Sequence, residues 1–138
     1  MSSEIMEKSS ALVSRCSIGV LSTVDRNGIP HQKAMIKTSA IGLKEFWFCT
    51  NTSSKRVQQI KANANVSLYF YDEKTYEGLM LSGKAVVSYD ETKRKEFWND
   101  GMKVYYPYGW TNPDYALIKF IAVKGNYYHG FTNTDFNL

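Results

Sequence analysis

The chain has 138 residues, of which 43% are hydrophobic, so its length and composition suit one domain, residues 1–138, with a core of its own. With 22% charged and 14% aromatic residues, the composition argues against a disordered chain. The formal net charge of +4 favours anionic ligands or nucleic acid without requiring either.

Short helices and strands alternate along the first half of the sequence. Apolar residues at helical spacing predict a helix near the N-terminus. The Asn27-Gly28 pair then predicts the turn of a hairpin. Gly42 marks a further turn, and Asn63 is expected to end the second helix. The predicted elements are a helix at residues 3–15, strands at 17–24, 29–38 and 43–50, and a helix at 53–62.

The second half has longer strands, and Gly83 marks a bulge or a close approach of backbones. Its predicted elements are strands at residues 66–71, 78–89, 115–123 and 126–131, a helix from 90 or 92 to about 100, an aromatic loop at 104–110 and a polar tail after 132. Most strands are joined by hairpin-length links, which favours antiparallel pairing. We therefore expect a mainly β fold, a β-barrel of six to seven mostly antiparallel strands with short helices.

Cysteine content and hydropathy lead to expectations about disulfides, metal sites and cellular location. Cys16 and Cys49 lie in apolar, strand-like segments, where free thiols are expected rather than a disulfide. There is no C-x-x-C or paired-histidine spacing, so no metal site is expected. The polar N-terminus and the lack of a long apolar run lead us to expect a soluble, cytoplasmic protein that does not associate with a membrane.

Basic residues alternate with apolar ones on the strand around residues 33–37 (KAMIK). On a strand, Lys33 and Lys37 share one face and lie roughly 13 Å apart. That separation suits the two ends of a flavin mononucleotide (FMN), although a solvated strand face explains the pattern equally well.

A second cluster, Thr50, Ser53, Ser54 and Lys55, precedes or opens the helix at 53–62. Ordinary N-capping explains the serines. Lys55 and Arg56 are not explained in this way, because cations in a first helical turn oppose the helix dipole. We therefore favour a phosphate site at this helix start.

Other candidate residues carry less information. One or two aromatic residues of the 104–110 loop could face a pocket, but packing or a dimer interface is the commoner role of such a loop. His31 and His129 are isolated acid–base candidates, more often surface residues. No serine-hydrolase, P-loop or Rossmann motif occurs, and no catalytic residue is assigned.

With these residues placed, the sequence resembles the pyridoxamine 5′-phosphate oxidase-like proteins, and within them the general stress protein branch. The resemblance covers residues 9–129 and rests on the order and spacing of several short motifs. These motifs are residues 30–35 (PHQKAM), 46–50 (FWFCT), 53–55 (SSK), 63–66 (NANV), 81–85 (LSGKA) and 106–109 (YPYG).

The resemblance implies a split β-barrel of the FMN-binding type that forms a homodimer with two FMN molecules at the subunit interface. Lys33 takes the place of a phosphate-binding arginine, and Tyr128 takes that of a flavin-contacting tryptophan. The cofactor-binding residues expected from the two lines of reasoning are Lys33, Ala34, Met35, Ile36, Lys37, Cys49, Thr50, Ser53, Ser54, Lys55 and Tyr128.

The sequence also departs from the oxidases. The arginine and histidine that hold pyridoxine phosphate have no counterpart in residues 131–136, and a flavin-contacting glutamine is replaced near Gly78. We therefore expect a flavin-dependent oxidoreductase of an unknown small molecule rather than a vitamin B6 oxidase. The alternatives are a non-catalytic flavin-binding or flavin-sensing dimer and a haem protein with His31 or His129 as ligand. A nucleic-acid-binding barrel ranks last, and no nucleic-acid partner is expected.

Overall fold

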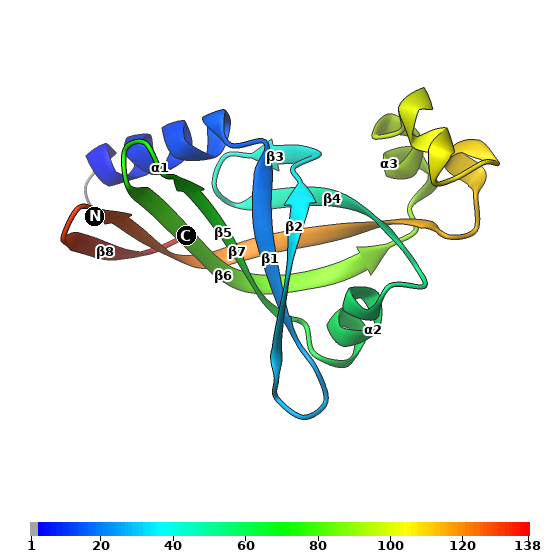
Figure 1. The fold of residues 1–138 in the computed structure, drawn as a ribbon, viewed down its shortest axis with the longest axis horizontal. Coiled ribbons are helices and arrows are strands. Elements are labelled where there is room, and N and C mark those ends of the chain that lie inside the picture. The colour runs from blue at the N-terminus through cyan, green and yellow to red at the C-terminus, as the bar shows by residue number, and fades with distance from the viewer. Residues whose placement is uncertain (1–2) are drawn as a thin grey trace.

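A curled antiparallel sheet forms the framework of the protein in a computed structural model that describes residues 3–138 (Figure 1). The strands are β1 (Ile18–Val24), β2 (Pro30–Ile36), β3 (Ser39–Ile41), β4 (Glu45–Asn51), β5 (Asn65–Asp72), β6 (Glu77–Ser88), β7 (Tyr115–His129) and β8 (Thr132–Asn137). The helices are α1 (Ser3–Arg15), α2 (Lys55–Ala62), α3 (Glu91–Glu96) and two 3₁₀ turns, η1 (Asp100–Val104) and η2 (Gly109–Thr111). The strand order is β2-β1-β5-β6-β7-β4-β3, with β8 on β7.

The core lies inside the curl of the sheet. Alternate residues of β1 and β5 point inward, as expected for strands with one buried face. Phe46 sits at the centre, with its ring centroid 5.7 Å from that of Phe70 and 6.1 Å from that of Phe120. Leu12 of α1 joins this core, and so does Ile60 of α2. The predicted class, a mainly β barrel with short helices, is confirmed.

The C-terminal strands differ from the prediction. The expected strands at 115–123 and 126–131 are one continuous strand, β7, and the expected polar tail is a further strand, β8. Lys124 and Gly125, between the two predicted strands, both pair with β6, and a bulge lies one residue earlier. Ser82 pairs with Lys124 and Gly83 pairs with Ala122, so Val123 has no partner on β6. Gly83 is the close approach that was predicted, because a Cβ there would lie 1.9 Å from the carbonyl oxygen of Ile121.

Two smaller corrections concern β3 and α3. The short edge strand β3 was not predicted, so the sheet has eight strands among the described residues rather than six or seven. The helix expected to reach residue 100 ends at Glu96. Phe97 is its C-cap, and the backbone N–H of Phe97 donates to the carbonyl oxygens of Lys93 and Lys95. The two 3₁₀ turns η1 and η2 lie where the sequence predicted the end of this helix and an aromatic loop.

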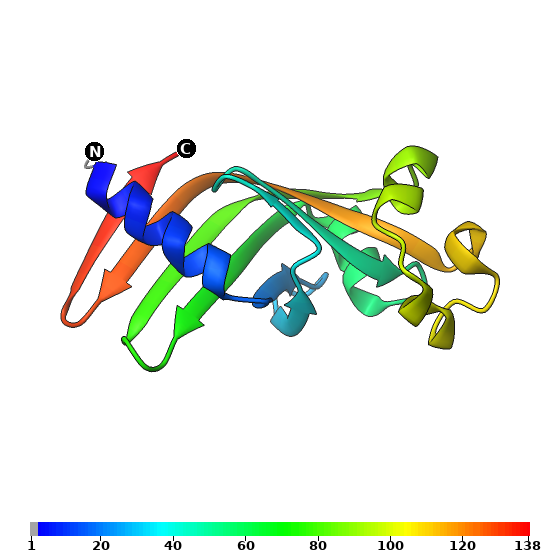
Figure 2. The same ribbon diagram turned by 90° about the horizontal axis from the view of Figure 1, so that it is seen from above.

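Residues 91–111, which we call the cap, carry α3, η1 and η2. The cap lies at one end of the sheet and α1 lies at the other (Figure 2). A separate aromatic cluster fastens the cap to the sheet, with Tyr106 and Trp98 packed against Tyr115 and Trp47 of the strands. Within residues 3–138, no helix has the length and apolar character that crossing a membrane requires.

Candidate functional site

A cavity of about 800 Å³ lies between β2, the start of α2 and the cap. Six of the predicted cofactor residues line it, which are Lys33, Ala34, Met35, Ile36, Lys37 and Cys49. Thr38 and Arg56 also line it. The cap contributes Glu96, Phe97, Asn99, Met102, Tyr105 and Tyr106. The structure therefore brings the basic strand, one residue of the aromatic strand and the cap to one site.

The basic strand presents different chemistry at successive positions. β2 is an edge strand of the sheet, and Lys33, Ala34 and Ile36 are exposed while Met35 is buried. The ammonium of Lys37 donates to the carbonyl of Val13, 2.5 Å away in the last turn of α1. A cation is favourable at that end of a helix. Lys37 therefore joins α1 to the wall of the cavity, while Lys33 stays exposed.

Arg56 is the cation of the cavity with the clearest need for a partner. It is half-buried, and its Nε donates to the hydroxyl of Thr50 at 3.1 Å, which is itself buried. Burial lowers the pKa of the guanidinium. Within residues 3–138 no carboxylate forms an ion pair with it, although guanidinium groups strongly prefer carboxylate or phosphate acceptors. The cavity thus offers a half-buried positive charge to an anion.

The predicted helix-start cluster is divided between several tasks. Ser54 is the N-cap of α2, and its hydroxyl accepts from the backbone N–H of Val57 at 3.3 Å. Ser53 donates its backbone N–H and its hydroxyl to Asp114, at 3.0 and 3.2 Å. Lys55 is exposed and does not line the cavity. Arg56, one residue further along α2, takes the place in the cavity that the sequence assigned to Lys55.

Tyr128 lies away from this cavity. It lines a different one, of about 430 Å³, together with three other tyrosines, Tyr69, Tyr71 and Tyr76. Its ring centroid is 5.9 Å from that of Tyr76. Within one chain, Tyr128 and the basic strand therefore do not line a common cavity.

Cys49 lines the cavity as a neutral thiol. Thr38 donates its hydroxyl to the sulfur at 3.6 Å, and the hydroxyl of Tyr115 lies 3.8 Å from it. Burial raises the pKa of the thiol above its ordinary value of 9.0, so the thiolate that a nucleophile would need is not formed near pH 7. Both cysteines are free, as expected.

Neither histidine lines the cavity. His31 pairs with Asp25 at 2.8 Å beside the β1–β2 turn, and His129 ends β7. Two of the aromatic residues of the loop, Tyr105 and Tyr106, do line it. Their place could not be read from the sequence, because four aromatic residues within seven positions carry no signal for which of them is covered.

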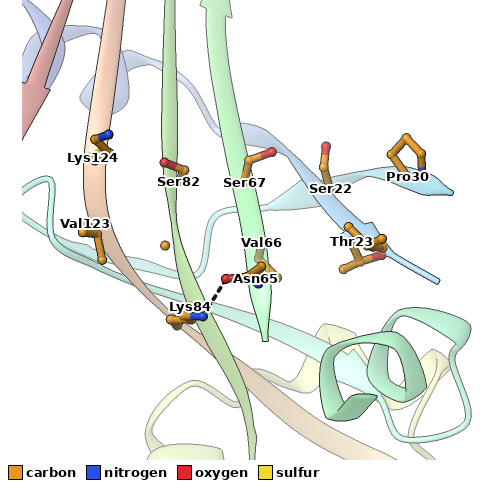
Figure 3. Close-up of a pocket in the computed structure, with 12 residues that line it drawn as sticks. Ser22, Thr23, Pro30, Asn65, Val66, Ser67, Ser82, Lys84, Val123 and Lys124 are labelled. Carbon is orange, nitrogen blue, oxygen red and sulfur yellow. Dashed lines mark hydrogen bonds between the residues drawn. The ribbon is translucent and has the colours of Figure 1, made fainter. Parts of the chain in front are cut away.

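A shallower cavity of about 460 Å³ lies on the outer face of the sheet (Figure 3). Ser22, Ser67 and Ser82 are direct partners on β1, β5 and β6, and Lys124 of β7 is opposite Ser82. These side chains lie side by side across four strands. The small serine side chains leave a depression in this part of the face. The neighbouring row of outward-facing residues has the larger side chains of Tyr69 and Met80, which project further from the sheet.

Known proteins of one family match nearly the whole chain. A sequence model described as "Pyridoxamine 5′-phosphate oxidase like" matches residues 4–135. A solved structure from Clostridium acetobutylicum, of a protein related to general stress protein 26 of B. subtilis in the pyridoxinephosphate oxidase family, is 37% identical. It covers 100% of this chain and 97% of its own, with a TM-score of 0.90.

More distant matches differ in coverage and in ligand. A pyridoxine/pyridoxamine 5′-phosphate oxidase of Vibrio campbellii is 40% identical over 50 residues, which is 36% of this chain but only 23% of that enzyme. An FMN binding protein of Nostoc punctiforme is 17% identical over 96% of this chain and 86% of its own, with a TM-score of 0.72. A heme binding protein of Mycobacterium smegmatis is 13% identical over 96% and 57%, with a TM-score of 0.76. These last two share the fold.

Proposed function

The chain belongs to the pyridoxamine 5′-phosphate oxidase-like family, and on this premise we propose that it binds FMN and serves as a flavin-dependent oxidoreductase of a small molecule. One observation carries the proposal. The half-buried Arg56 lines a cavity of about 800 Å³ together with the whole basic strand, and it has no carboxylate partner within residues 3–138. A phosphorylated ligand satisfies that guanidinium.

The residues present fit FMN in charge and in surface. Lys33 and Arg56 would attract the phosphate, while Ala34, Ile36 and Met102 offer apolar contacts to a flat ring. Thr50 orients Arg56 through the hydroxyl that accepts from its Nε. Among residues 3–138, Glu96 is the one acid that lines the cavity, and its charge is paired with Lys93 at 3.3 Å. The wall is therefore positive overall, which suits an anion.

When bound, flavin supplies the redox chemistry, and the protein supplies binding, orientation and electrostatics. Arg56 and Lys33 would fix the anionic end of the cofactor, and the neutral thiol of Cys49 would add a small, polarisable contact. The cap would limit the access of water from one side. The tail at residues 131–136 carries no arginine or histidine, so the proposed substrate is not pyridoxine phosphate.

We also propose that the cavity is completed in a homodimer. Ala34 and Ile36 line it and are at the same time exposed on the edge strand β2. Ala34 is opposite Val20, and Val20 is opposite Tyr69, so the strand residues that line the cavity adjoin the apolar outer face of the sheet. Tyr128 would meet the cofactor only from the partner subunit.

The first experiment is a visible absorption spectrum of the purified, dialysed protein, followed by a titration with FMN. We expect a flavin spectrum that stays with the protein. In Arg56→Ala, loss of a charge-assisted contact should weaken FMN binding by about 10- to 100-fold. Arg26→Ala, which removes an exposed arginine at the β1–β2 turn, is the matched control and should bind normally.

Three other results would change the assignment. A Soret-type band would move the protein to the haem alternative. Normal FMN affinity in Arg56→Ala, with loss of affinity in Lys55→Ala, would return the phosphate site to the residue that the sequence suggested. Bound flavin that a nicotinamide cofactor cannot reduce, or that passes no electrons to an acceptor, would support the non-catalytic alternative.

A further inference from the structure

Tyr106 is a buried phenol at the wall of the cavity whose hydroxyl lacks a partner. Its side chain is part of the cap, and the residue is only 7% exposed. The ring packs against Tyr115 and Trp98, with centroid distances of 5.2 and 6.3 Å. Within residues 3–138 its hydroxyl makes no hydrogen bond. The hydroxyl oxygen is also not one of the fully buried side-chain atoms that lack a partner, which are Ser9 Oγ and Arg94 Nε. It is therefore a donor that the cavity can still reach.

Tyr115, in the same aromatic cluster, shows how a buried phenol hydroxyl is satisfied within the protein. Tyr115 is fully buried, and its hydroxyl donates to the carbonyl of Arg94 at 2.8 Å. A buried hydroxyl without a partner costs free energy, so such groups are normally satisfied. Unlike Tyr115, Tyr106 lines the cavity, and its hydroxyl makes no hydrogen bond within residues 3–138.

Tyr106 shares its cavity with Arg56, the residue proposed to hold the phosphate, and its hydroxyl keeps its proton. Burial raises the pKa of Tyr106, and the Asp114 carboxylate and Cys49 raise it further, whereas Arg56 lowers it. The phenol is therefore protonated near pH 7 and acts as a donor. Tyr106 and Arg56 line the same cavity, and no carboxylate within residues 3–138 forms an ion pair with that guanidinium. Two donors from different elements, α2 and the cap, are therefore offered to one ligand.

We propose that the Tyr106 hydroxyl donates a hydrogen bond to the phosphate of bound FMN beside Arg56, so that the cap is part of the phosphate-binding site. This assignment rests on the proposed FMN binding. It makes Tyr106 a cofactor-binding residue and gives the cap a role in affinity. It also predicts that the Tyr106 hydroxyl contributes to the binding of FMN but not of riboflavin, which has the same ring and ribityl chain without the phosphate.

The test compares FMN with riboflavin in Tyr106→Phe, which removes the hydroxyl and keeps the ring in its cluster. We expect FMN affinity to fall about 5- to 20-fold and riboflavin affinity to stay unchanged. Tyr108→Phe, at an exposed tyrosine of the cap that does not line the cavity, is the matched control and should bind both ligands as the wild type does. Equal losses for both ligands, or no loss for either, would overturn the assignment to phosphate.

A second probe separates this inference from the proposed function. If the wild type bound no FMN at all, the proposed function would fail, and inorganic phosphate would then be the ligand to use. Thermal stabilisation of the wild type by phosphate, reduced in Tyr106→Phe and in Arg56→Ala, would keep the two donors as an anion site. Absence of stabilisation, or equal stabilisation of all three proteins, would overturn the inference.

Discussion

At the scale of single residues, Asp114 organises the loop that leads into α2. Its carboxylate accepts from the hydroxyl of Thr52 at 2.7 Å and from the backbone N–H of Ser53 at 3.0 Å. Its backbone carbonyl accepts from the N–H of Thr52 at 2.8 Å. Three donors that could have met a phosphate are thereby satisfied within the protein. Arg56, which lines the cavity, is then the residue of this helix start that the cavity offers to the proposed phosphate.

Replacing Asp114 with Asn should lower stability in a pH-dependent way. The Thr52 hydroxyl, and then the Ser53 donors, lower the pKa of Asp114 below its ordinary value of 3.8. The stabilisation is therefore complete above that value and is lost as the pH falls through the lowered pKa. By urea denaturation we expect Asp114→Asn to be less stable by about 1 kcal/mol at pH 7. This difference should shrink below pH 3.8, and Glu73→Gln, at an exposed acid, is the control. A difference that stayed constant with pH would exclude this role of the carboxylate.

Arg56 also shows how far the sequence alone could lead. The run of hydroxyl and basic residues correctly located a helix start, and the alternation of residues 33–37 correctly located a strand. The sequence could not decide between Lys55 and Arg56, because adjacent residues of a helix point about 100° apart and the direction of the cavity depends on the tertiary fold. The same limit applied to Tyr106, whose burial depends on Tyr115 and Trp98.

At the scale of secondary-structure elements, β8 shows why local patterns miss an edge strand. Its sequence, TNTDFN, has one buried residue, Phe136, so no alternation of apolar residues announces it. The strand forms because the ring of Phe136 covers Gly125 of β7. A Cβ at Gly125 would lie 2.3 Å from the tip of that ring. Gly125, which lies between the two strands predicted from the sequence, is the point at which Phe136 of β8 docks.

An alanine at Gly125 should therefore destabilise the protein by about 1–3 kcal/mol, because the Phe136 ring must move. In a Phe136→Leu background, which lacks the tip of the ring, the same substitution should cost little. Urea denaturation of the four proteins of this cycle measures the coupling. Gly101→Ala, where the added Cβ would meet only the Asn99 side chain at 3.1 Å, is the comparison. Equal costs in both backgrounds would show that the ring does not limit residue 125.

At the scale of the whole molecule, the outer face of the sheet is unusually apolar for a surface. Tyr69 and Met80 are direct partners on β5 and β6 and are 39% and 42% exposed. Ile18 and Ile36, also partners, extend the patch to the edge strand at 44% and 72% exposure. Large apolar patches on soluble proteins usually mark interfaces. Because Ile36 also lines the cavity, an interface here would border the proposed FMN site.

A charge at the centre of this face should therefore affect assembly and cofactor binding together. We expect the wild type to sediment as a dimer, and Met80→Lys to sediment as a monomer, because a lysine ammonium would be buried without a partner in the interface. FMN affinity should fall in the same variant, although Met80 does not line the 800 Å³ cavity. Ile41→Lys puts the same charge at an exposed residue of β3, at the opposite edge of the sheet, and should change neither property. A monomeric wild type with full FMN affinity would show that one chain completes the site. A monomeric Met80→Lys with normal affinity would place the flavin away from the interface.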